Sequence, residues 1–349
     1  MGAGEERIGQ RPGRVAGPRH PLTDPGAPDA EAGVRNIVVI GGSAGGVQAV
    51  GRLVAALPAD FPAAVFVVVH VAAISKSRLP EILGRQGHLP AGHASDGEAI
   101  VPGRIYVAPP DLHLLLERDT MRLWHGPREN SCRPSIDVLF RSAADTYGSR
   151  VAGVILSGSL DDGSQGLLAI KRKGGLTLVQ DPQEASYPEM PRNAIRLAGP
   201  DRVGGLADLA ALLAASAEDG THRLDPDRDQ LPPPTVEGAD STIDPLCPQC
   251  GSALHEVRDS RGLLRCQAGH VYSLESLYAH HGESLQQALQ ASLDALRQEA
   301  RLARQVADQA RRQGQSIAAE RYRQRQLASE RHAVALAKLL DERVRTANM

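Results

Sequence analysis

Five short runs rich in Val, Ile and Leu, separated by glycine-rich turns and helical stretches, constrain the fold of this chain more than any other feature. The runs do not alternate between apolar and polar residues, which is typical of strands buried on both faces of a parallel sheet. Repeated strand–helix–strand units predict an α/β fold with a doubly wound, mostly parallel sheet. The expected strands are 36–40, 64–70, 104–108, 151–156 and 176–180, and the expected helices are 47–57, 135–147, 166–173 and 206–215.

An antiparallel hairpin is expected at the edge of this sheet. Residues 113–118 and 121–125 are largely apolar and flank the turn at Asp119 and Thr120. The α/β domain as a whole is expected to extend over residues 35–217. Residues 1–34 are rich in Gly, Pro and Arg and lack the apolar core of a secretory signal, so we expect a disordered tail there.

The remaining chain divides into three segments. Residues 218–244 contain four prolines among polar residues, which is typical of a linker. Residues 245–282 hold three of the four cysteines. Residues 283–349 carry Leu and Ala at helical spacing, interrupted before Ser316, the expected N-cap of a second helix. These helices either cap the domain as a solvated hairpin or mediate partner docking or self-association, and the sequence favours neither.

Charge and composition exclude several classes of protein. Among the 349 residues, 39 Lys and Arg nearly balance 41 Asp and Glu, so no basic field attracts nucleic acid. No apolar run reaches the ~18 residues of a membrane span, which argues against membrane insertion. Four cysteines in a chain of this length do not form a disulfide framework, which favours a reducing, cytoplasmic location.

A glycine-rich turn, residues 41–46, follows the first expected strand and precedes a helix. A dinucleotide-binding loop needs G-x-G-x-x-G, and here Ser43 and Ala44 stand where the middle glycine would fall. Such a loop also needs an acidic residue after the second strand, and His70 ends that strand instead. The pattern G-x-S-x-G does fit, with Ser43 at its centre in a strand–turn–helix context. Ser43 is therefore a candidate nucleophile.

His70 and the pair Asp161 and Asp162 complete a candidate catalytic site. The carboxyl ends of parallel strands share one edge of a sheet, and Ser43, His70 and the two acids each follow such an end. A carboxylate there can orient the imidazole that deprotonates the serine. A structural histidine and a solvated acidic turn are the alternatives. The chain order Ser, His, Asp differs from that of the α/β-hydrolases and argues for a separate family.

Residues 35–215 resemble the CheB protein-glutamate methylesterases of bacterial chemotaxis. The resemblance rests on a long series of motifs in the same order. These are residues 40–46, His70, 96–98 with 102–103, 106–109 with Asp111 and His113, 133–140, 154–158 with 162–163, and 190–192. In this series Asp162, rather than Asp161, stands at the family's aspartate position before a glycine.

The resemblance implies a catalytic triad of Ser43, His70 and Asp162 that needs no catalytic cofactor. It implies hydrolysis of glutamate γ-methyl esters on a methylated chemoreceptor or related signalling protein, with deamidation of glutamine as a second activity. Usual members carry an N-terminal receiver domain, for which residues 1–34 are too short, so the resemblance does not carry over their control by phosphorylation. The alternative is a catalytically silent or altered-specificity scaffold that binds partners through its C-terminal segments.

Four further residues are expected to serve the reaction. Backbone N–H groups at Ala44 and Gly45, and near Ser159, are expected to bind the oxyanion of an acyl-transfer intermediate. Arg192 is expected to pair with an acidic flank of the substrate, the alternative being an exposed arginine that is only solvated. Cys132 stands where the family often has a histidine, and as a lone thiol it is expected to be inert.

The remaining three cysteines and a histidine have the spacing of a metal site. Cys247, Cys250, Cys266 and His270 form C-x2-C-x15-C-x3-H, close to the two-knuckle spacing of tetrahedral zinc sites. A short hairpin is expected between the knuckles, and a segment this small needs a metal to fold. His255 is a poorer ligand because it lies in a strand. We expect a zinc ribbon with a structural zinc, the alternative being three unconnected thiols.

Overall fold

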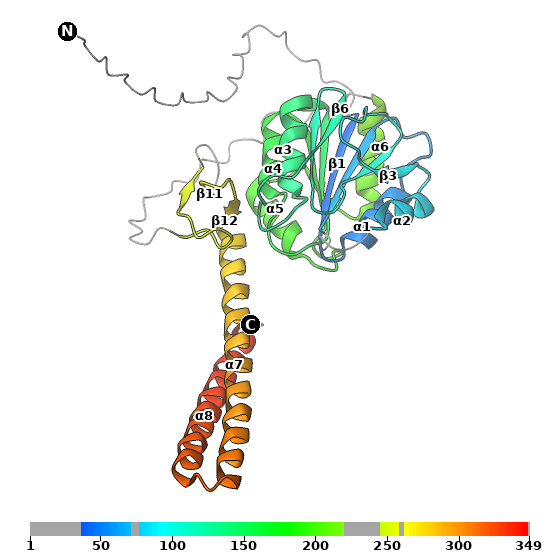
Figure 1. Ribbon diagram of the computed structural model, residues 1–349. Helices are drawn as coiled ribbons and strands as arrows, with labels where there is room; N and C mark the ends of the chain where they lie inside the picture. The colour runs from blue at the N-terminus through cyan, green and yellow to red at the C-terminus, as the bar shows by residue number, and fades with distance from the viewer. Residues whose placement is uncertain (1–35, 71–76, 220–244, 258–261, 348–349) are drawn as a thin grey trace, which may run out of the picture. The chain divides into compact units, whose positions relative to one another are not determined.

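The computed structural model describes residues 36–70, 77–219, 245–257 and 262–347 (Figure 1). The tail expected at 1–34 and almost all of the linker expected at 218–244 lie outside the described residues.

A seven-stranded sheet forms the centre of the α/β domain, and all of its strand pairs are parallel. The strand order is β3-β4-β2-β1-β7-β8-β9, so later strands lie on both sides of β1, and β4 lies between β2 and the edge strand β3. This confirms the predicted doubly wound fold. The strands are β1 (Ile37–Gly42), β2 (Ala64–Val69), β3 (Ala91–His93), β4 (Ile105–Val107), β7 (Val151–Ile155), β8 (Leu176–Gln180) and β9 (Arg202–Gly204).

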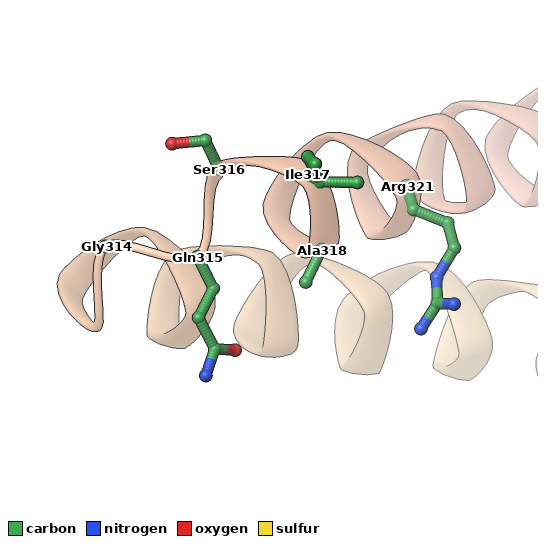
Figure 2. A pocket seen from close by; sticks show the side chains of 6 residues that line it. All are labelled: Gly314, Gln315, Ser316, Ile317, Ala318 and Arg321. Carbon is green, nitrogen blue, oxygen red and sulfur yellow. The ribbon is translucent and has the colours of Figure 1, made fainter.

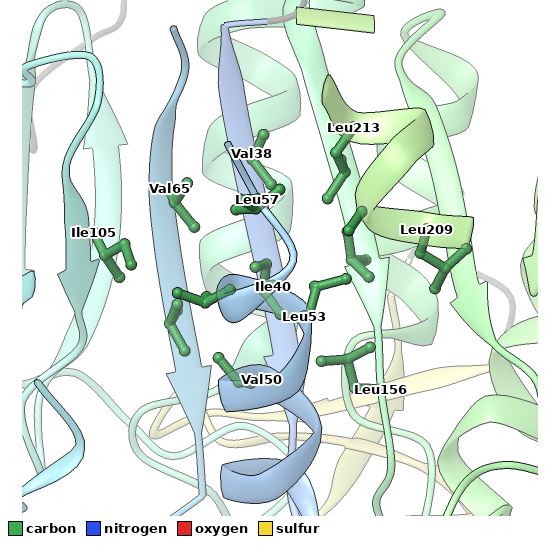
Figure 3. Packing of buried hydrophobic residues seen from close by; sticks show 14 of the residues in the cluster. Val38, Ile40, Val50, Leu53, Leu57, Val65, Ile105, Leu156, Leu209 and Leu213 are labelled. Atoms are coloured by element: carbon green, nitrogen blue, oxygen red, sulfur yellow. The ribbon is translucent and has the colours of Figure 1, made fainter. Parts of the chain in front are cut away.

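Helices cover both faces of the sheet, which explains why the strands are apolar throughout. Val38 and Ile40 of β1 pack on one face with α1, α2 and α6, part of which Figure 3 shows. Ile37 and Val39 pack on the other face with α3, α4 and α5. The helices are α1 (Gly46–Ala55), α2 (Leu79–Gln86), α3 (Ile136–Tyr147), α4 (Ser164–Arg172), α5 (Glu189–Ala198) and α6 (Leu206–Asp219), with a 3₁₀ turn at Gly148–Arg150.

The predicted hairpin is present as β5 (His113–Glu117) and β6 (Thr120–Trp124), which pair antiparallel. The sequence predicted that the hairpin lies at the edge of the large sheet. In the structure it forms a separate two-stranded sheet, and the edges of the large sheet are β3 and β9. Leu114 and Leu116 of β5 are buried in the same cluster as α3. The hairpin is therefore held by packing on α3 and by backbone hydrogen bonds to residues 97–100, and not by pairing with an edge strand of the large sheet.

The Cys/His segment folds as a three-stranded antiparallel sheet. Its strands are β10 (Leu254–Glu256), β11 (Leu263–Cys266) and β12 (Val271–Ser273), of which the sequence predicted only the first two. Helix α7 (Leu274–Arg312) follows directly, with Ser273 as its N-cap, and so it starts before residue 283, where the helical region was expected. We call the described part of residues 245–347 the C-terminal module.

Helices α7 and α8 (Ser316–Ala347) pack along each other as a hairpin. Alanines form most of the buried seam of α7, and Leu293 meets Ala333 and Leu340 of α8 in a small apolar cluster. Helix α8 begins at Ser316, where the sequence predicted a second helix. The turn holds an open hollow of about 550 Å³ beside the exposed Ile317, shown in Figure 2. Within the described ranges, no helix is both long and apolar enough to cross a membrane.

Candidate active site

Ser43 lies in the tight turn between β1 and α1. Gly45 has a φ of 71°, and a Cβ there would lie 2.7 Å from Ser157 Oγ, so the turn needs glycine at this position. The backbone N–H of Ser43 donates to the Ser157 carbonyl at 2.9 Å. The Ser157 hydroxyl donates in turn to the Ala44 carbonyl at 2.8 Å. The turn is thereby tied to the chain just after β7, at the carboxyl edge of the sheet.

His70 directly follows β2 and lies beside Ser43. Gly42 of β1 is paired with Val69 of β2, so the next residue of each strand emerges at the same height. His70 Nδ1 lies 3.2 Å from Ser43 Oγ, and His70 Nε2 lies 2.8 Å from Asp162 Oδ2. The structure therefore brings the three predicted side chains together in one hydrogen-bonded series.

Asp162 is held at the N-terminus of α3. Its Oδ2 accepts from the backbone N–H of Ile136 at 2.7 Å, and its Oδ1 accepts from the Asp137 N–H at 3.3 Å. The Ser135 hydroxyl at 2.8 Å and Asn130 Nδ2 at 3.1 Å also donate to Oδ1. The free N–H groups and the dipole of a helix N-terminus stabilise a carboxylate. The side chain is thus fixed before any substrate binds.

Two opposing effects set the charges of this series. Burial opposes the negative charge of Asp162, but the hydrogen bonds from His70, Ile136 and Asn130 outweigh it and lower the pKa of Asp162 to about 2. Burial also opposes the imidazolium of His70, but Cys132 and Asp162 raise the pKa of His70 well above its ordinary value. The aspartate is therefore charged at neutral pH, and His70 becomes a free base only as the pH rises.

Asp161, the other acidic candidate, faces away from the imidazole. Its Oδ1 accepts from the hydroxyl groups of Ser273 at 2.9 Å and Ser276 at 2.8 Å. Burial raises the pKa of Asp161 above its ordinary value, and these two hydroxyl groups partly offset the effect. The geometry thus favours Asp162 as the partner of His70.

The residues expected to bind the oxyanion lie around Ser43. In the described part of the chain, the N–H groups of Ala44 and Gly45 donate to no acceptor. Ser159 follows Gly158, at which a Cβ would lie 3.0 Å from Ser43 Cβ. Arg192 is exposed on α5, two residues after Met190, whose side chain packs against Gly158. All four residues therefore belong to segments that border Ser43.

Three residues close to the site make contacts that sequence reasoning did not predict. Ser135 precedes α3 and donates a hydrogen bond to Asp162, and a serine at the start of an expected helix is a signal that could have located it. Cys132 Sγ lies 3.6 Å from His70 Nδ1, and Asn130 bonds to Asp162. Neither lies in a periodic segment, so the sequence carries no signal for these contacts.

The four predicted metal ligands also converge. Cys266 Sγ lies 3.6 Å from Cys250 Sγ and 3.4 Å from His270 Nδ1, and Cys247 Sγ lies 3.5 Å from His270 Nδ1. All four ligand atoms lie within 4.8 Å of one another. Tetrahedral zinc, with Zn–S of about 2.3 Å and Zn–N of about 2.0 Å, separates its ligand atoms by about 3.4–3.8 Å. The donor set fits zinc, and His255, which is exposed in β10, lies outside it.

The site has the arrangement of the serine hydrolases. A serine after the first strand lies within hydrogen-bonding distance of a histidine, and that histidine is hydrogen-bonded to a buried aspartate. The sequence pattern of the family described as CheB methylesterase matches residues 38–213, half of this chain. The chain belongs to the CheB methylesterase family.

Named relatives and one solved structure agree with this assignment. A Leptospira interrogans protein named as a protein-glutamate methylesterase/protein-glutamine glutaminase is 43% identical over 176 residues, 50% of this chain and 91% of that protein. A Bordetella pertussis protein of the same name is 37% identical over 198 residues, 55% of this chain and 56% of that protein. The crystal structure of the Thermotoga maritima CheB methylesterase catalytic domain matches with a TM-score of 0.50 and 31% identity, covering 52% of this chain and 97% of that one.

Proposed function

We propose that the chain is a protein-glutamate methylesterase that hydrolyses γ-methyl esters of glutamate side chains and also deamidates glutamine. The series Ser43, His70 and Asp162, with separations of 3.2 and 2.8 Å, carries this proposal. Family membership and the names of the relatives support the same reaction. Nothing in these observations favours the alternative of a catalytically silent scaffold.

The reaction is an acyl transfer in two halves. His70 Nδ1 accepts the proton of Ser43 Oγ as that oxygen attacks the ester carbonyl carbon. The same proton passes from His70 to the departing methoxide, which leaves as methanol, or to the departing amine of glutamine, which leaves as ammonia. Water, deprotonated by His70, then attacks the acyl-enzyme and releases glutamate and Ser43. Asp162 accepts the Nε2–H of His70 and stabilises the imidazolium in both halves.

The negative oxygen of each tetrahedral intermediate needs hydrogen-bond donors. The N–H groups of Ala44 and Gly45 are assigned this role because they are free and lie in the same turn as Ser43, and the chain at Ser159 is assigned a supporting one. Arg192 is assigned to an acidic flank of the substrate, because it is exposed on the helix that borders Gly158. The proposed substrate is a methylated chemoreceptor or a related signalling protein.

Methanol release from a methylated receptor fragment tests the proposal. The full chain should release methanol, and Ser43→Ala should lower kcat by roughly 10⁴-fold or more. Ser292→Ala, which removes an exposed serine on α7, is the matched control and should keep full activity. Equal methanol release by the Ser43→Ala variant would reject Ser43 as the nucleophile.

We also propose that Cys247, Cys250, Cys266 and His270 bind a structural zinc ion. The ligand separations support this, and the small apolar cluster around Tyr272 is too small to fold this segment without a metal. Metal analysis of the full chain, purified without chelator, should find about one equivalent of zinc, and Cys266→Ser should lose it. Less than about half an equivalent would contradict the site.

The free cysteines support a reducing compartment, and we propose that the reaction takes place in the cytoplasm. Self-association or partner docking through α7 and α8 stays a prediction. Light scattering of the full chain should give a dimer mass if the hairpin self-associates, and a monomer mass if it does not.

A further inference from the structure

The C-terminal module contacts the α/β domain at a loop beside the candidate active site, residues 129–132. The backbone N–H of Asn130 donates to the Val271 carbonyl at 2.8 Å, and the N–H of Ser273 donates to Asn130 Oδ1 at 3.0 Å. Glu129 and Val271 form a parallel bridge, and the Ser131 hydroxyl lies 3.0 Å from His280 Nδ1. Strand β12 and the start of α7 therefore dock on this loop through backbone and side-chain hydrogen bonds.

The other end of the Asn130 amide reaches the catalytic carboxylate. Its Nδ2 donates to Asp162 Oδ1 at 3.1 Å and to Asp137 Oδ2 at 3.2 Å. Asn130 is 5% exposed, so these bonds are made away from water, where each has more effect than at a surface. A single side chain thus joins the first turn of α7, through Ser273, to the aspartate that holds His70.

The backbone of the loop explains why this link needs support. Asn130 has a φ of 49° and Ser131 a φ of 63°, so two successive residues with side chains adopt the left-handed conformation. This conformation is unfavourable for L-amino acids other than glycine, with asparagine among the better tolerated. Strained residues persist only where their surroundings hold them. Here the surroundings include Val271, Ser273 and His280 of the C-terminal module.

Asp161 supplies a second link to the same turn of α7. It directly precedes Asp162 and accepts hydrogen bonds from the hydroxyl groups of Ser273 and Ser276. Without these donors, the largely buried carboxylate of Asp161 would lose hydrogen bonds that offset the cost of its burial. Both neighbours of the catalytic aspartate, one in space and one in sequence, are therefore bonded to the start of α7.

We propose that Asn130 is a positioning residue for Asp162, and that docking of the C-terminal module on Asn130 and Asp161 sets the catalytic rate. The proposal rests on the proposed function, because it concerns the rate of the same reaction. Release of the module would let the 129–132 loop relax from its left-handed conformation and would free the carboxylate of Asp162 from one of its donors.

The first test is Asn130→Gly in the full chain. Glycine keeps the left-handed backbone accessible, so the loop can fold while the amide is lost. We expect kcat to fall roughly 10- to 100-fold with KM nearly unchanged, since the reacting groups and not substrate binding are disturbed. With one donor lost, Asp162 should stabilise the imidazolium of His70 more, and the acid limb of the rate profile should move to higher pH. A purely structural defect would lower the rate equally at every pH.

The second test concerns the module. The double variant Ser273→Ala/Ser276→Ala removes both hydroxyl groups from Asp161, and Ser292→Ala on the same helix is the control. We expect kcat to fall several-fold in the double variant only, and hydrogen exchange to become faster at residues 271–276. Combined with Asn130→Gly, the losses should be less than multiplicative, because both changes act on Asp162.

These outcomes separate the two proposals. Full kcat and an unmoved acid limb in Asn130→Gly, with an active parent chain, would overturn the positioning role alone. Faster exchange in the double variant at unchanged kcat would overturn the effect of docking on rate. An inactive parent chain would contradict the proposed function, and titration of His70 by NMR in Asn130→Gly would still test the link to Asp162.

Discussion

Cys132 Sγ lies 3.6 Å from His70 Nδ1, the same nitrogen that lies 3.2 Å from Ser43 Oγ. The thiol is partly exposed and belongs to the loop that also carries Asn130. The sequence predicted an inert, lone cysteine at this position. That prediction is untested, and the structure places the sulfur beside both the imidazole and the candidate nucleophile.

The variant Cys132→Ala should be active at lower pH than the parent chain. Burial lowers the pKa of His70, while Cys132 and Asp162 raise it, and the net pKa lies well above the ordinary value. Removing Cys132 removes one raising contribution, so the pKa of His70 should fall. The free base is the active form, and its fraction increases with pH, so the acid limb of kcat/KM should move to lower pH. An unmoved limb would contradict this coupling.

Alkylation of Cys132 should inhibit the enzyme. A carboxamidomethyl group on a sulfur 3.6 Å from His70 would occupy the space between the imidazole and an incoming ester. Iodoacetamide should therefore abolish methanol release from the parent chain and spare the Cys132→Ala variant. That variant also controls for reaction at the other cysteines, and equal inhibition of both proteins would assign the effect to them.

The variant Asp162→Asn should lower kcat by roughly 10³- to 10⁴-fold, because an amide does not stabilise the imidazolium as a carboxylate does. KM for a methylated fragment should change little. Asp145→Asn, an exposed acid on α3 whose carboxylate pairs with Lys173, is the control and should keep kcat. A kcat for Asp162→Asn within a few-fold of the parent value would show that His70 needs no charged partner.

The variant Gly45→Ala should be less stable and less active than the parent chain. The φ of 71° is strained for alanine, at a cost of about 1–2 kcal/mol, and the new Cβ would contact Ser157 Oγ. Urea unfolding of the α/β domain should give a lower midpoint, and kcat should fall because Ser43 and the free N–H groups share this turn. Unchanged stability would mean that the turn adapts without strain.

The buried strands and the positions of their carboxyl ends were predictable, because an unbroken apolar run indicates a strand that is buried on both faces. Ser43 and His70 followed from that rule, since both directly succeed such runs. The edge strands β3 and β9 were not found, because three-residue strands containing Gly92 or Gly204 have no periodicity. The sequence alone left Asp161 and Asp162 open, because adjacent residues share every local signal and differ only in the direction of their side chains.

The position of the C-terminal module could not be inferred from local patterns. Its contacts join residues that are far apart in the chain, such as Arg196 with Glu275, 79 positions apart, and Ser273 with Asp161, 112 positions apart. The convergence of the four candidate metal ligands was predictable for the opposite reason, since they lie in two short knuckles. Local spacing thus gave the composition of the module and said nothing of its docking surface.

The left-handed backbone at Asn130 limits which amino acids this position can accept. Glycine satisfies the backbone and loses the amide, while glutamine carries the amide on a longer stem that does not share asparagine's tolerance of this conformation. Aspartate would bring a third carboxylate next to Asp137 and Asp162, where burial already raises the pKa of Asp137 well above its ordinary value. If every amino acid is tested at position 130 and scored for methanol release, almost all variants should therefore be less active than the chain with asparagine.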